Sequence, residues 1–83
     1  MGEFTDVKRR KLLKLLNWLS QKPHMTIKAG GKHQIIVKYN FWDRPFPIPF
    51  KHNTVNKYIV KAFMDKLVVS NICTEEEFRD HVG

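Results

Sequence analysis

The chain has 83 residues, of which 15 are Lys or Arg and 8 are Asp or Glu, so its formal net charge is +7. We expect one small domain over residues 1–83, because a chain of this length buries only a compact core. The single cysteine excludes an internal disulfide framework. No apolar run approaches the ~18 residues that span a bilayer, and the N-terminal residues lack the apolar centre of a secretory signal. We therefore expect a cytoplasmic protein with no membrane partner.

Positive charge is concentrated in the first 72 residues. This part has fourteen Lys and Arg against four Asp and Glu, a net charge of +10, whereas residues 73–83 have a net charge of −3. A small domain this basic attracts polyanions, and nucleic acid is the partner class that we favour. An anionic membrane surface or an acidic protein fits less well, because the basic residues are not confined to one amphipathic helix. A basic surface that is merely solvated is the simplest alternative.

A basic helix is predicted near the N-terminus. Thr5 and Asp6 are suited to cap it, and it extends to about Ser20. Leucines at steps of three and four residues form one apolar stripe, namely Leu12, Leu15, Leu16 and Leu19. Basic residues occupy much of the remaining surface, namely Lys8, Arg9, Arg10, Lys11 and Lys14. We interpret this basic surface either as a solvated face or as one that contacts phosphates.

Three strands in an antiparallel meander are predicted next. Residues 24–29 alternate between apolar and polar, Gly30-Gly31 indicates a turn, and residues 33–40 have the strongest strand character. Proline occupies every second position of residues 45–50, which suits only an edge strand whose missing donors face away from the sheet. Either alternate set of side chains on the second strand could face the helices, because isoleucine occurs in both sets.

Two further helices complete the predicted fold. Asn53 or Thr54 caps the first of them, and a capping box of Thr74 and Glu77 opens a short acidic helix. The predicted class is therefore α+β, in the order α-β-β-β-α with a short extra C-terminal helix. We expect a three-stranded antiparallel sheet with the helices on one face, as in double-stranded-RNA-binding domains.

Histidines are better catalytic candidates than carboxylates in this sequence. The basic part has only four Asp or Glu, which argues against a nuclease that holds Mg²⁺ in clustered oxygen ligands. RNA is cleaved without metal when a base removes the proton of the ribose 2′-OH, and histidine titrates in the useful range. His33 opens the second strand and His52 follows the third, so both belong to one end of the predicted meander. Lys32 or Lys51 could stabilise charge on the phosphate, whereas a purely structural histidine is the plainer alternative.

Several segments resemble the HicA (YcfA-like) toxin family. They are Gly31-Lys32-His33 before an apolar strand, the proline-flanked strand at 46–50, His52, and the helix sequence at 54–63. The likeness covers most of the chain. Lys32 stands where the family usually has serine, and Gln34 where many members have a second histidine.

This resemblance implies an mRNA interferase, an endoribonuclease toxin that acts independently of the ribosome and that a HicB-type antitoxin neutralises. By the same resemblance His33 matches the catalytic histidine. We expect Lys28, Lys32, Lys51 and His52 to bind RNA, with no metal site and no small-molecule cofactor. The alternatives are a non-catalytic RNA-binding module of the same fold and a protein-interaction or transcription-regulator subunit.

Two aromatic residues, Phe41 and Trp42, lie at the predicted tip of the second hairpin. They could stack on RNA bases, contact an antitoxin or pack back onto the core. Of these three interpretations we favour packing onto the core.

Overall fold

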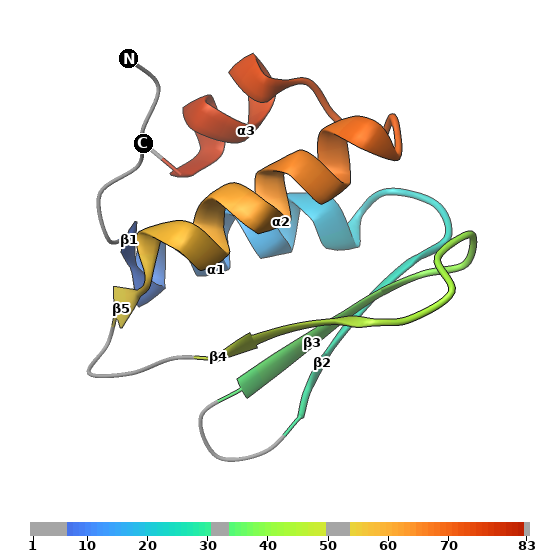
Figure 1. Ribbon diagram of the computed structural model, residues 1–83, viewed down its shortest axis with the longest axis horizontal. Coiled ribbons are helices and arrows are strands. Elements are labelled where there is room, and N and C mark those ends of the chain that lie inside the picture. The colour runs from blue at the N-terminus through green and yellow to red at the C-terminus, as the bar shows by residue number, and fades with distance from the viewer. Residues whose placement is uncertain (1–6, 31–33, 50–53, 83) are drawn as a thin grey trace.

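The computed structural model describes residues 7–30, 34–49 and 54–82 (Figure 1). The elements are β1 (Val7–Lys8), α1 (Arg9–Ser20), β2 (Met25–Ala29), β3 (Gln34–Tyr39), β4 (Phe46–Pro49), β5 (Thr54–Val55), α2 (Lys57–Val69) and α3 (Glu75–Val82). The predicted α+β class is confirmed, as is the order of a helix, a three-stranded antiparallel sheet and two helices. No helix in the described ranges is long and apolar enough to cross a membrane.

The three-stranded sheet has the predicted meander order β2-β3-β4, with β4 at one edge of the described strands. Pro47 and Pro49 of β4 pair with Ile36 and Gln34 of β3. Because proline has no N–H, these two residues cannot donate to any neighbouring strand. The alternating prolines therefore explain why β4 lies at an edge, and they also discourage a second chain from pairing there.

The sheet has one side that faces the helices and one open side. Val37 is fully buried, and Ile35 and Tyr39 pack against the core, whereas Lys38 between them is exposed. Figure 1 shows the helices on one side of the sheet and no described element on the other. The structure therefore decides the question that the sequence left open, because the set containing Val37 faces the helices.

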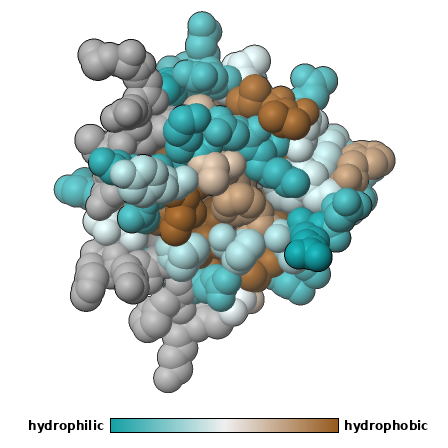
Figure 2. Space-filling model, in the orientation of Figure 1, coloured by the Kyte–Doolittle hydropathy of each residue, from teal (hydrophilic) through white to brown (hydrophobic). Residues whose placement is uncertain are grey.

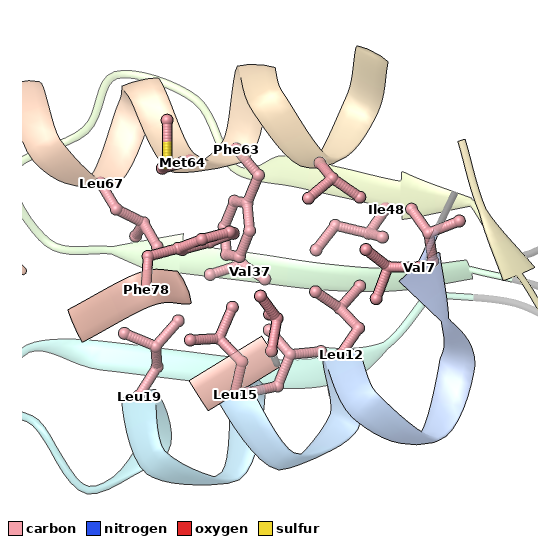
Figure 3. Close-up of a cluster of buried hydrophobic side chains, with 14 of the residues drawn as sticks. Val7, Leu12, Leu15, Leu19, Val37, Ile48, Phe63, Met64, Leu67 and Phe78 are labelled. Atoms are coloured by element: carbon pink, nitrogen blue, oxygen red, sulfur yellow. The ribbon is translucent and has the colours of Figure 1, made fainter. Parts of the chain in front are cut away.

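The hydrophobic core lies between the helices and the sheet. Its largest fully buried side chains are Phe63, Phe78, Leu12, Leu15, Leu19, Ile48, Leu67, Val37, Val55 and Val60. Figure 3 shows leucines of α1 and side chains of α2 converging from opposite sides on Val37 of the sheet. The predicted leucine stripe of α1 is fully confirmed, since all four of its members are buried. Burial of this apolar surface is the main driving force for the fold.

Helix α1 begins later than predicted because the residues before it form a strand. Val7 and Lys8 belong to β1, which pairs with β5 and buries the valine. The helix starts at Arg9, and Lys8 at its N-cap makes no side-chain capping bond. The predicted cap at Thr5 or Asp6 is therefore wrong, because the chain is still extended at Lys8, with ψ of 141°.

Helix α2 also begins later than predicted. Thr54 and Val55 form β5, so neither the predicted cap at Thr54 nor the one at Asn53 is right. The cap is Asn56, whose side-chain oxygen accepts a hydrogen bond from the backbone N–H of Tyr58 at 2.8 Å. An asparagine oxygen at this position satisfies a donor that the first turn of the helix leaves unpaired.

The predicted capping box of α3 is present. The backbone N–H of Thr74 donates to Oε1 of Glu77 at 2.9 Å, and the backbone N–H of Glu77 donates to Oγ1 of Thr74 at 3.1 Å. The bond from the Thr74 backbone is the largest of the effects that together hold the pKa of Glu77 below its ordinary value of 4.5, and desolvation opposes it. The ionised carboxylate therefore stabilises the start of α3.

We expect the Glu77→Gln substitution to remove a pH-dependent contribution to the free energy of unfolding of the domain. Because the folded-state pKa is lowered, the ionised group stabilises the protein above the ordinary pKa, and this contribution disappears as the pH falls through the folded-state pKa. Urea unfolding of wild type and variant should differ most near neutral pH and converge in acid. Glu76→Gln is the matched control, since it removes the same charge from the same turn. Parallel pH profiles of the two variants would contradict the prediction.

Candidate nucleic-acid interface

Most of the predicted site lies outside the described residues. This applies to the predicted catalytic His33 and to three predicted RNA contacts, Lys32, Lys51 and His52. Lys28 is described, and it is an exposed residue of β2. The structure therefore defines the surroundings of the predicted site through the residues that flank it.

The flanking residues converge at one end of the sheet. The N–H of Gly30, just after β2, donates to the carbonyl of Gln34, the first residue of β3, at 3.0 Å. Gln34 in turn pairs with Pro49, the last residue of β4. Gly30, Gln34 and Pro49, the described residues next to the segments at 31–33 and 50–53, therefore lie at the same end of the sheet.

Gly30 has a steric explanation that needs no function. A Cβ atom at this position would collide with the side chain of Ile36, which covers the glycine from the paired strand. Only glycine leaves room for that contact without a shift of the isoleucine. The hairpin between β2 and β3 is confirmed by their pairing, and Gly30 serves the packing of that hairpin.

Positive charge also collects where the two long helices begin. Figure 1 shows the N-terminal ends of α1 and α2 next to the β1–β5 pair. Exposed basic residues at these ends are Lys8, Arg9, Arg10, Lys11 and Lys57. Neither helix has an acidic residue in its first turn, and a helix N-terminus itself carries partial positive charge. Because of this positive charge, this end of the molecule is well suited to attract a polyanion. It is linked to the predicted RNA contacts, since β5 directly follows the segment at 50–53 in the chain.

The open side of the sheet carries two adjacent lysines. Lys28 pairs with Ile36 and Lys38 pairs with Thr26, so the lysines are diagonal neighbours on the same side. The Lys28 ammonium lowers the pKa of Lys38, first because it can donate a hydrogen bond only to the neutral amine of Lys38, and second because it repels the charged form. The strands β2, β3 and β4 contain no Asp or Glu.

Lys38 was not among the predicted site residues, although the sequence contains a signal for it. A hairpin closed at Gly30 fixes the alternation of both strands, so every second residue of each strand shares one side of the sheet. The parity of Lys38 then places it beside Lys28, which was predicted to bind RNA. The register confirms this shared side.

The two aromatic residues of the hairpin tip behave differently. Trp42 packs against the core, its Nε1–H donates to Oγ of Ser70 at 2.6 Å, and Nζ of Lys66 lies 5.3 Å from its ring. The prediction that the tip packs onto the core is therefore right for Trp42. It is wrong for Phe41, which is 72% exposed. Because Tyr39 ends β3 just before this tip, Phe41 lies at the opposite end of the sheet from Gln34.

Hydrophilic residues predominate on the face of the molecule that Figure 2 shows. On the face shown in Figure 2, small groups of hydrophobic residues are surrounded by hydrophilic ones. The exposed large hydrophobic residues of the described part are Leu13, Phe41, Tyr58, Val68 and Val69. A ligand that approaches this face therefore meets mainly polar and charged groups.

The acidic helix α3 covers one end of the basic helix α1. The rings of Trp18 and His81 stack with their centroids 3.9 Å apart, and Nζ of Lys22 lies 4.5 Å from the Trp18 ring. Trp18 is therefore a packing residue. The C-terminal end of α1 is accordingly less accessible to a polyanion than its N-terminal end.

Neither a metal site nor a reactive thiol is visible in the described part of the chain. Its residues contain no group of three or more His, Cys, Asp or Glu side chains positioned to hold a metal ion. Cys73 is buried, and burial raises the pKa of its thiol. A thiol that stays protonated is a poor nucleophile, so Cys73 acts as a small hydrophobic residue of the core.

No protein-family model, curated protein or solved structure matches the chain.

Proposed function

We propose that this protein is a HicA-type mRNA interferase, an endoribonuclease that cleaves RNA without a metal ion and that a HicB-type antitoxin neutralises. The main support is the sequence of two segments, Gly31-Lys32-His33 and Lys51-His52, together with the pairing of Gln34 and Pro49, which are described residues next to them in the chain. The placement of the helices on one side of the sheet is consistent with a fold like that of double-stranded-RNA-binding domains.

In this proposal His33 supplies general acid–base catalysis. A base removes the proton of the ribose 2′-OH, the freed oxygen attacks the adjacent phosphorus, and the bond from phosphorus to the 5′-oxygen breaks. The products are a 2′,3′-cyclic phosphate and a 5′-hydroxyl that receives a proton from an acid. Lys32 or Lys51 stabilises the negative charge of the transition state.

Chain length allows the proposed groups to act on one phosphate. His33 is bonded to Gln34, and His52 follows Pro49 by three residues, with consecutive Cα atoms about 3.8 Å apart. His52 is therefore our candidate for the second acid–base group. The positively charged ends of α1 and α2 beside β5 would draw an RNA strand toward this end of the molecule.

The proposal is tested by cleavage of an RNA substrate in the presence of EDTA. We expect His33→Ala to lower the rate by about 10²–10⁴-fold, the usual contribution of a general acid or base. The control is His24→Asn, at the other end of β2, where asparagine tolerates the positive φ of 66°. Growth arrest on expression of wild type, but not of His33→Ala, is the matching cellular readout.

Three outcomes would contradict parts of this proposal. Equal cleavage by wild type and His33→Ala would remove the catalytic assignment, and loss of cleavage in EDTA would remove the metal-free mechanism. RNA binding without any cleavage by wild type would instead select the non-catalytic RNA-binding module.

A further inference from the structure

The open side of the three-stranded sheet offers a second basic site, separate from the predicted catalytic end. We propose that Lys28 and Lys38 together bind one phosphate group of the RNA strand. The inference depends on the proposed function in one respect, because it takes RNA as the source of the phosphate. It adds a path for the strand across the face of the sheet that the helices do not cover.

The register of the hairpin places both ammonium groups within reach of one anion. Lys28 pairs with Ile36, and Lys38 is two residues further along β3 on the same side. Diagonal neighbours of this kind lie about 7–8 Å apart at the backbone, a separation that two lysine side chains easily bridge. The closeness that this register gives agrees with the lowered pKa of Lys38, of which Lys28 is the main cause.

Among the described residues, no negative charge is paired with these two lysines. Within the described part of the chain neither ammonium group has a carboxylate partner, whereas Lys61 on α2 pairs with Asp65 at 3.0 Å. None of the three strands contributes an acidic residue. Two like charges held together are unfavourable, so an anion with several acceptor oxygens would relieve the repulsion between them.

The chemistry of this face favours a phosphate contact over a base contact. The aromatic side chains of the strands, Tyr39 and Phe46, pack against the core on the other side of the sheet. The open side has no aromatic residue of β2, β3 or β4 on which a base could stack. Binding here would therefore be independent of base sequence and strongly dependent on salt.

The test measures binding of a labelled single-stranded 2′-O-methyl RNA at several salt concentrations. This RNA lacks the attacking hydroxyl, so binding is measured without cleavage. We expect Lys28→Gln with Lys38→Gln to weaken binding and to reduce the slope of log K against log[salt] by about 0.7, the value for one phosphate of a single strand. The control is Lys61→Gln, which removes one exposed positive charge from α2.

A second readout follows Lys38 directly by NMR titration of its side-chain carbons. Bound RNA is expected to raise the pKa of Lys38 toward its ordinary value, because a phosphate favours the charged form. If both lysines bind the same phosphate, the effects of the two single substitutions on the binding free energy should not add up to the effect of the double substitution.

The possible failures can be told apart. If the double variant binds with the affinity and salt slope of Lys61→Gln while wild type still cleaves unmodified RNA, the sheet site is wrong and the proposed function stands. If wild type neither binds nor cleaves RNA, both proposals fall. An unchanged Lys38 titration in saturating RNA would also overturn the sheet site.

Discussion

Replacing Phe78 with alanine is expected to destabilise the domain by about 3–5 kcal/mol, the usual cost of deleting a buried phenylalanine side chain. Phe78 is fully buried, and its ring lies edge-on to that of Phe63, with the centroids 6.1 Å apart. It joins α3 to the core shared by the two long helices. Because small domains are stable by only about 5–15 kcal/mol, this loss should leave the variant close to unfolding at room temperature.

The matched control for this prediction is Phe41→Ala. The phenylalanine at position 41 is 72% exposed at the hairpin tip, so its removal should change the free energy of unfolding by about 0.5 kcal/mol or less. Urea unfolding followed by circular dichroism measures both variants. Equal destabilisation would contradict the assigned packing. Loss of only the α3 signal in Phe78→Ala, with a normal main transition, would mean that α3 is not part of the cooperative core.

The elements that the sequence predicts well are those specified by local patterns. The leucine spacing of α1 specifies a buried stripe, and the alternating prolines after Arg44 specify an edge strand. The capping box of Thr74 and Glu77 specifies the start of α3 through bonds within four residues. Such signals depend on chain neighbours alone, so they hold before any tertiary contact is known.

The features that the sequence does not predict depend on contacts between distant segments. The β1–β5 pair joins two strands of two residues each, which are too short to show any periodicity. That pairing delays the start of both long helices. The side of β3 that faces the core follows from its partner Ile48, which is fully buried opposite Ile35. Because positions 35 and 36 are both isoleucine, the sequence does not indicate which side of β3 faces the core until the register is known.

The candidate site was predicted mainly from the short sequence Gly31-Lys32-His33 and from His52, together with the excess of basic residues. The structure adds that the flanks of the two segments meet, which required the pairing of Gln34 with Pro49. It also adds Lys38, whose relation to Lys28 depends on the register of the hairpin. Residues that pair across a hairpin can be predicted once the position of its turn is known. Contacts between segments that are distant in the sequence cannot be predicted in this way.

The two sides of β3 predict opposite effects for the same substitution at neighbouring positions. Val37→Glu is expected to prevent folding at neutral pH, because Val37 is fully buried in the core. An ionised carboxylate without a partner costs several kcal/mol in such a site, and protonating it instead also costs free energy at neutral pH. A one-dimensional NMR spectrum without dispersed methyl signals, together with lost circular dichroism, would show the unfolded chain.

Ile36→Glu is the matched variant, and we expect it to fold. Ile36 is half-buried on the open side, where it pairs directly with Lys28 and shares that side with Lys38. The new carboxylate would lie beside two unbalanced cations, so the loss of apolar contact and strand propensity should cost only about 1–2 kcal/mol. It should also raise the pKa of Lys38, because an opposite charge favours the ammonium form. If Ile36→Glu unfolds while Val37→Glu folds, the side of β3 assigned to the core is reversed, and the open basic face inferred from it is lost.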